Sequence, residues 1–332
     1  MSHILLLGAG FSRNWGGWLA SEAFEYLLGH PEISCSRQLL DLLWRNLPTG
    51  GFENALAEVQ ADYKRDSVAN KKHLDAFQRA VTDMFDDMNK CFDVTGFEFE
   101  FQRFQERTVR TFLSRFDAIF TLNQDLLIEH QYIDPDLSLL SNGRWNGSEL
   151  PGMRPLKNSD VENLSYWGRR KWVPEESSRF QVNDRLQPYF KLHGSSNWQE
   201  KEGDSMLIMG GNKVSGIVQS PVLSWYQEKF EEYLFQADAR LMVIGYGFRD
   251  EHINKVVIRA VKNSNLKMFI IAPEGGNLAR TVNPTHGAAI RARTDLEDAF
   301  QLGLIGASRR SLREIFGNDT VEFNKVNRFF EA

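Results

Sequence analysis

Four short polar motifs each follow a run of apolar residues. Their residue types are an amide, carboxylates, an imidazole and glycines, which can hold a phosphate or move a proton. They are Gly8–Ser12 (GAGFS), Thr121–Asp125 (TLNQD), His193–Gly194 (HG) and Gly245–Asp250 (GYGFRD). Because ligands of open α/β sheets bind at the carboxyl ends of strands, we expect these motifs to share one crevice.

The first loop is compatible with a dinucleotide phosphate. It lacks the Gly-Lys-Ser/Thr of a P-loop, and Arg13 stands where a dehydrogenase fingerprint has its third glycine. Gly8 and Gly10 still let the backbone approach a pyrophosphate at a helix N-terminus. We expect Ser12 to add a hydroxyl group or to cap that helix.

The middle motifs carry groups for acid–base work. Asn123 and Asp125 stand two residues apart at a strand-to-helix junction, so either can reach the crevice. The alternative for Asp125 is that it caps the helix, which does not exclude binding. His193 ends an apolar run and suits proton transfer, since its ordinary pKa is near neutrality. Gly194 would admit a substrate. A structural histidine is the alternative for His193, and the other six histidines, His252 among them, show no metal-binding spacing.

The last motif again places glycines after a strand. Gly245 and Gly247 could admit the second half of a dinucleotide, and Asp250 is expected to cap the helix that follows. We assign no metal-binding residue.

The elements around these motifs predict a doubly wound parallel sheet. Continuous apolar runs bounded by Gly, Asn or Pro are typical of strands covered on both faces. The predicted strands are 3–7, 117–122, 189–193, 241–245 and 267–272, and the predicted helices after them are 12–28, 124–131, 224–237 and 250–262. Strand followed by helix, repeated, is typical of an α/β fold.

The domain prediction is a Rossmann-like unit with insertions. We assign 1–34 and 116–275 to the Rossmann-like domain and 134–188, which is rich in Pro and Gly, to a lid or loop within it. Residues 35–115 form a helical insertion, with an apolar face predicted to be core at Phe77, Val81, Met84, Phe85 and Met88. The segment 276–332 is expected to be helical and to pack on the core or on a partner.

Composition narrows the class of protein. The 332 residues are 42% hydrophobic and 25% charged, as in globular proteins, and the net charge of −5 gives no overall attraction to nucleic acid. The apolar runs are too short to span a membrane, and the first strand leaves no room for a signal segment, so we expect a cytoplasmic protein. Cys35 and Cys91 cannot form a four-thiolate zinc site; we expect two buried thiols rather than a disulfide.

In this order, GAGFS, TLNQD, HG and GYGFRD resemble the Sir2 family, in its bacterial branch without the zinc module. The resemblance implies that Gly8, Ala9, Gly10, Phe11 and Ser12 bind the NAD+ pyrophosphate. It implies that Asn123 and Asp125 serve the nicotinamide ribose and that His193 is the catalytic base. We place Thr121, Gly194, Gly245, Gly247 and Asp250 among the NAD+-contacting positions.

The resemblance implies an NAD+ glycohydrolase that forms nicotinamide and ADP-ribose, in antiphage defence. The missing four-cysteine module and the missing GIPDFR segment leave water as the acceptor. The alternatives are an ADP-ribosyltransferase or deacylase, and a non-catalytic NAD+ or ADP-ribose sensor. The family also implies a homo-oligomer and a partner ATPase, helicase or nucleic-acid sensor. The trigger, the partner's identity and the choice between NAD+ and NADP+ stay open.

Overall fold

The computed structural model describes residues 1–48, 51–96, 108–133, 137–156, 170–200, 205–210, 213–282 and 292–331. Its strands are β1 (His3–Leu7), β2 (Ala118–Thr121), β3 (Gly147–Glu149), β4 (Met153–Pro155), β5 (Trp172–Pro174), β6 (Leu186–Lys191), β7 (Gly194–Gln199), β8 (Ser205–Leu207), β9 (Arg240–Ile244), β10 (Lys267–Ile271) and β11 (Leu304–Ser308).

The longer helices are α2 (Ala20–Gly29), α4 (Arg37–Asn46), α5 (Gly51–Arg65), α6 (Ser67–Val94), α10 (Lys213–Gln219), α11 (Pro221–Leu234), α12 (Glu251–Ser264), α14 (Asp295–Gly303), α15 (Leu312–Gly317) and α16 (Thr320–Asn327). The shorter ones are α1 (Ala9–Ser12), η1 (Arg13–Trp15), α3 (Pro31–Ser34), α7 (Val109–Leu113), α8 (Leu127–Gln131), α9 (Leu137–Leu140), η4 (Ser177–Arg179), η5 (Gly275–Asn277), α13 (Leu278–Val282) and η6 (Arg328–Phe330).

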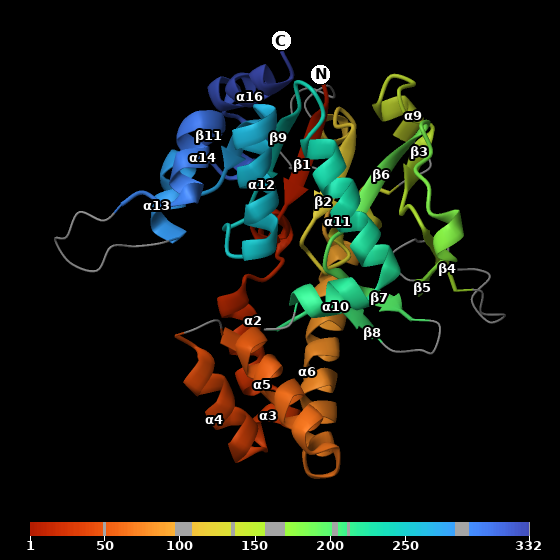
Figure 1. The fold of residues 1–332 in the computed structure, drawn as a ribbon, viewed down its shortest axis with the longest axis vertical. Coiled ribbons are helices and arrows are strands. Elements are labelled where there is room, and N and C mark those ends of the chain that lie inside the picture. The colour runs from red at the N-terminus through yellow and green to blue at the C-terminus, as the bar shows by residue number, and fades with distance from the viewer. Residues whose placement is uncertain are drawn as a thin grey trace.

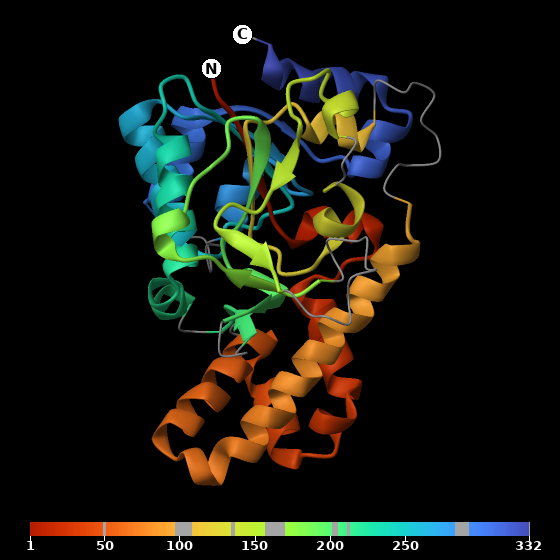
Figure 2. The ribbon, with the colours of Figure 1, turned by 90° about the vertical axis from the view of Figure 1, so that its right-hand side faces the viewer.

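The main sheet confirms the predicted α/β fold. Its seven strands in the described residues are all parallel and run β11-β10-β9-β1-β2-β6-β3. Apart from the edge strand β3, this is the 3-2-1-4-5-6 order of a Rossmann-like sheet, whose switch point lies between β1 and β9. The side chains of Ile4 to Leu7 are fully buried because helices cover both sides of the sheet (Figure 1, Figure 2).

The five predicted strands are all present, with small shifts at their ends. The largest shift is in β6, which begins at Leu186 and ends at Lys191, so His193 lies in the turn between β6 and β7. The sequence missed β11, the edge strand within the segment that was expected to be helical. Gly306 and the exposed Ile305 interrupt the apolar run that would indicate a buried strand.

A bundle of helices projects from the sheet. Helices α2 to α6 form the lower part of Figure 1, and the long α6 rises from it toward the sheet (Figure 2). The apolar face predicted on α6 is buried: Phe77, Val81, Met84, Phe85 and Met88. Farther along α6, Asn89 accepts a hydrogen bond from the Leu126 amide at 2.9 Å and donates one to Ser196 at 3.1 Å. The bundle therefore contacts the loop that follows β2 and the strand β7.

A second, four-stranded sheet packs between the main sheet and the bundle, in the order β4-β5-β7-β8. Two of its strands and β3 come from the segment 134–188, for which the sequence predicted little regular structure. Residues 134–136 and 157–169 of that segment, like 283–291 near the C-terminus, lie outside the described residues. The C-terminal segment packs on the core, where Phe329 contacts His3 and Phe269.

Two local predictions are wrong. The helix expected over 12–28 is broken into α1, η1 and α2, because Gly16 adopts a left-handed φ of 91° and Gly17 donates a hydrogen bond back to Ser12. Cys35 and Cys91 are free, as expected, but they are exposed rather than buried. Among the described residues, the helices are too short or too polar to cross a bilayer.

Candidate functional site

The loop after β1 packs directly on the loop after β9. The Gly8 and Gly10 amides donate to Ile244 and Gly245 oxygens at 3.0 and 2.9 Å. Gly245 has a φ of +67°, and a Cβ there would lie 2.2 Å from the Phe11 nitrogen. These glycines are therefore required by the contact between the loops, a reason that the sequence did not reveal. The contact lies at the switch point, where this fold class binds dinucleotides.

Asn123 ties the β2 loop to the first loop. Its side-chain Nδ2 donates to the Gly8 oxygen at 3.1 Å and to Ser12 Oγ at 3.0 Å. Its amide nitrogen donates to Thr121 Oγ1 at 3.0 Å, so Thr121 positions the turn. Because Nδ2 has two hydrogens, Oδ1 is the atom of this buried amide left to accept a hydrogen bond.

Ser12 joins Asn123 to Asp125. It does not cap α1, whose N-cap is Gly8; its Oγ accepts from Asn123 Nδ2, and the same hydroxyl group acts to lower the pKa of Asp125. Asp125 accepts a hydrogen bond from the Leu127 amide at 3.1 Å, although the N-cap position of α8 is Leu126. Burial raises the pKa of Asp125, and the nearby Lys191 charge opposes the shift. Asp125 thus hydrogen-bonds to the start of α8, and its role as a site residue stays a prediction.

A buried ion pair beneath Asp125 was missed by the sequence analysis. Lys191 Nζ lies 2.6 Å from Glu129 Oε1 and donates to the Asp125 backbone oxygen at 2.5 Å. Both side chains are at most 1% exposed. The available signal was a lysine inside the apolar run of β6, because buried lysines require a partner.

The turn that carries His193 is fixed by Gln124 and Gly194. Gln124 Nε2 donates to the His193 oxygen at 3.0 Å and to the Ile208 oxygen at 2.7 Å. Gly194 has a φ of +74°, and a Cβ there would lie 1.8 Å from the Met206 oxygen. The backbone turn therefore requires glycine at position 194, and the approach of a substrate there stays a prediction. Gln124, the fourth residue of TLNQD, links that motif to HG.

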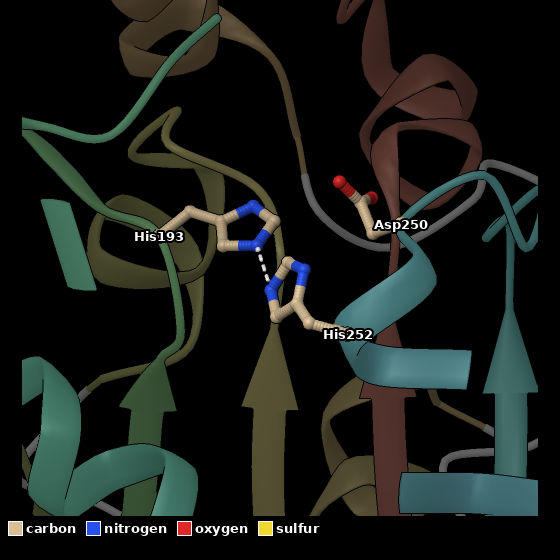
Figure 3. Close-up of side chains that lie close together, drawn as sticks. All are labelled: His193, Asp250 and His252. Atoms are coloured by element: carbon tan, nitrogen blue, oxygen red, sulfur yellow. Dashed lines mark hydrogen bonds between the residues drawn. The ribbon is translucent and has the colours of Figure 1, made fainter. Parts of the chain in front are cut away.

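His193 meets a second histidine that the sequence analysis set aside as structural. His193 Nε2 lies 3.2 Å from His252 Nε2, beyond the carboxyl ends of the strands (Figure 3). Asp250 and His252 come from the start of α12. Asp250 occupies the N-cap position, but its side chain makes no capping bond and accepts from Lys213 Nζ at 2.9 Å. The prediction that Asp250 caps α12 is therefore wrong for its side chain.

The pKa of His193 differs from the near-neutral value expected from the sequence. Burial lowers the pKa of His193 to about 3, and the Asp250 carboxylate opposes that shift. Burial also lowers the pKa of His252. Both imidazoles are therefore neutral near pH 7, and one ring donates to the other. One ligand atom from each of His193, Asp250 and His252 lies within 4.8 Å of the others, a spacing that can hold a metal ion.

A family model described as a SIR2-like domain matches residues 117–290. The chain belongs to the SIR2-like family. No curated protein sequence matches the chain. The SIR2-like match contains Asn123, Asp125, His193 and the loop after β9, whereas Gly8–Ser12 precede it and reach the site through hydrogen bonds. Membership implies an NAD+-related function.

The SIR2-like site fits NAD+ at two points. The glycine-lined contact of two loops lies at the switch point of a Rossmann-like sheet. A free amide acceptor on Asn123, a carboxylate and a neutral imidazole are supplied by the loops beside it. Among the other predicted positions, Ala9 and Gly247 are exposed, which leaves their backbones accessible to a ligand.

Proposed function

We propose that this SIR2-like protein is an NAD+ glycohydrolase that forms nicotinamide and ADP-ribose. The observation that supports it best is the hydrogen-bonded connection of its three polar motifs: Asn123 donates to Gly8 and Ser12 of the first loop, and Gln124 links TLNQD to His193. Groups that act on one sugar must be held in a fixed relation, and this network holds them.

The reaction breaks the bond between the nicotinamide nitrogen and the ribose carbon, and the electron pair of that bond leaves with nicotinamide. A water oxygen bonds to the same carbon and loses a proton. His193, neutral and buried, accepts that proton as the general base. Asp250 stabilises the resulting imidazolium, in accord with its effect on the His193 pKa.

The two remaining groups orient and stabilise the sugar. Asn123 Oδ1 accepts a hydrogen bond from a ribose hydroxyl or from water, while Nδ2 stays bonded to the first loop. Asp125 lies under the same loop and offsets positive charge that develops on the ribose. Its backbone is held by Lys191, so its position is fixed before substrate binds.

Hydrolysis is favoured over transfer to a peptide lysine because the chain has only two cysteines, too few for a four-cysteine peptide-binding module. We extend the proposal to the cellular role: depletion of NAD+ in antiphage defence, in a homo-oligomer with a partner ATPase, helicase or nucleic-acid sensor.

The test is an analysis of the products made from NAD+ labelled in its adenylate. Nicotinamide and free labelled ADP-ribose in equal amounts support the proposal. Label on protein without free ADP-ribose would instead identify a transferase, and tight binding of NAD+ without products would identify a sensor. A fall in cellular NAD+ on phage infection, absent with His193→Ala, tests the proposed cellular role.

A further inference from the structure

His193, Asp250 and His252 present three ligand-type side chains to one point. His193 comes from the turn after β6, and the other two come from the start of α12 after β9 (Figure 3). Their ligand atoms lie within 4.8 Å of one another, and the two Nε2 atoms are 3.2 Å apart. Two imidazoles and one carboxylate match the ligands that Zn²⁺ takes in proteins.

The spacing of the imidazoles suits zinc without rearrangement of the backbone. Zn–N bonds of about 2.0–2.1 Å place two nitrogens of a tetrahedral zinc roughly 3.3 Å apart. The His193–His252 nitrogen pair already stands at 3.2 Å. One imidazole must move its proton from Nε2 to Nδ1, after which both Nε2 lone pairs face the ion.

The charges beside the three ligands also favour a cation. Lys213 Nζ lies 2.8 Å from Glu53 Oε2 and 2.9 Å from Asp250 Oδ1. Two carboxylates thus share one ammonium group, which leaves one negative charge unbalanced. Because Lys213 keeps Glu53 as an acceptor, Asp250 can turn to a metal ion without leaving the lysine unpaired.

We propose that His193, Asp250 and His252 bind Zn²⁺ and that bound zinc inhibits the enzyme by occupying the lone pair with which His193 accepts a proton. The inhibitory part rests on the proposed function, whereas zinc binding does not. Water or a substrate oxygen completes the coordination. The site is inhibitory rather than structural, since the three residues are already assembled through a hydrogen bond and through Lys213.

Zinc binding is measured by calorimetric titration of metal-free protein with Zn²⁺ alone. All proteins carry Cys35→Ser and Cys91→Ser, because both thiols are exposed and bind zinc themselves. His252→Gln keeps a polar side chain but removes the imidazole. Loss of a residue that hydrogen-bonds to a metal ligand weakens metal binding by roughly 10- to 100-fold, so loss of the ligand His252 itself should weaken zinc binding at least as much. The matched control His73→Gln, on α6 away from the site, should leave affinity unchanged.

The variant Lys213→Met should change zinc affinity in the opposite direction. It removes a positive charge next to the ion and the ammonium group that competes for Asp250, so zinc should bind more tightly. Circular dichroism and thermal melting confirm that each variant folds. Equal zinc affinity in the parent and in folded His252→Gln, or the absence of zinc binding in the parent, would overturn the assignment.

NAD+ turnover with and without saturating zinc tests the inhibitory part. The parent should lose turnover with zinc and regain it after chelation. Turnover that persists while calorimetry shows the site filled would overturn inhibition. An absence of turnover in zinc-free protein would contradict the proposed function and not the metal site, because the titration measures the site independently.

Discussion

Replacing Lys191 by Met tests the buried support of the TLNQD turn. The change leaves Glu129 charged, buried and without its 2.6 Å partner, and frees the Asp125 oxygen from a 2.5 Å hydrogen bond. Removing one member of a buried ion pair costs about 3–5 kcal/mol. A loss of this size takes between about a fifth and all of a typical total of about 5–15 kcal/mol.

The stability lost in the Lys191→Met variant should depend on pH in a defined direction. Burial already raises the pKa of Glu129, and Lys191 holds that shift down, so the variant raises it further. A carboxyl group whose pKa is higher in the folded state is favoured there when protonated. The Lys191→Met penalty should therefore be smallest below the unfolded pKa of Glu129 and grow as pH rises through the folded pKa.

Urea unfolding at pH 5 and pH 7 measures both effects. The double variant Lys191→Met with Glu129→Gln should regain much of the stability, because no buried charge is left unpaired. Arg37→Met, which breaks an exposed pair with Asp41 on α4, is the matched control and should change stability little. A Lys191→Met variant as stable as this control, or one that loses stability equally at both pH values, would refute the reasoning.

Two further substitutions test the loop contacts. Gly245→Ala should lower the free energy of unfolding by at least about 1–2 kcal/mol, since its left-handed φ alone costs that much and its Cβ would meet backbone at 2.2 Å. Gly247→Ala, whose Cβ would meet nothing closer than 4.0 Å, should melt like the parent; equal melting of both variants would count against the packed loops. Ser12→Ala should cost about 1–3 kcal/mol, because it removes the buried acceptor of one of the two Asn123 Nδ2 hydrogens. It should also lower NAD+ turnover in protein that still folds, and unchanged kinetics would exclude Ser12 as a link.

The sheet could be predicted because its inner strands each have a recognisable local sequence pattern. A continuous apolar run such as Ile4–Leu7 fits only a position buried on both faces, and the chain order of such runs with helices between them predicts a Rossmann-like sheet. The four motifs were found for the same reason, since each follows one of these strands. The edge strand β11 was missed because half-exposed residues carry no such signal.

The site was predicted in part. Asn123, Asp125 and His193 could be chosen by residue type and position, but their partners depend on contacts between segments far apart in the chain. His252 meets His193 across 59 residues, and Lys213 pairs with Glu53 of the helical bundle. The glycines show the same limit: Gly8, Gly194 and Gly245 were singled out from the sequence as NAD+-contacting positions, but steric contacts with neighbouring loops, visible only in three dimensions, explain why glycine is needed.

The central claim is that His193 and Asn123 act on the bond between nicotinamide and ribose. Its most direct test is the rate of nicotinamide release from NAD+, measured by chromatography for the parent, His193→Ala, Asn123→Ala and the control His73→Gln, each purified alone and with proteins that bind it in its own host. The account predicts release by the parent and the control, and a loss of at least about 100-fold in both site variants. Release at the parent rate by either folded site variant, or no release by the parent in either preparation, would contradict it.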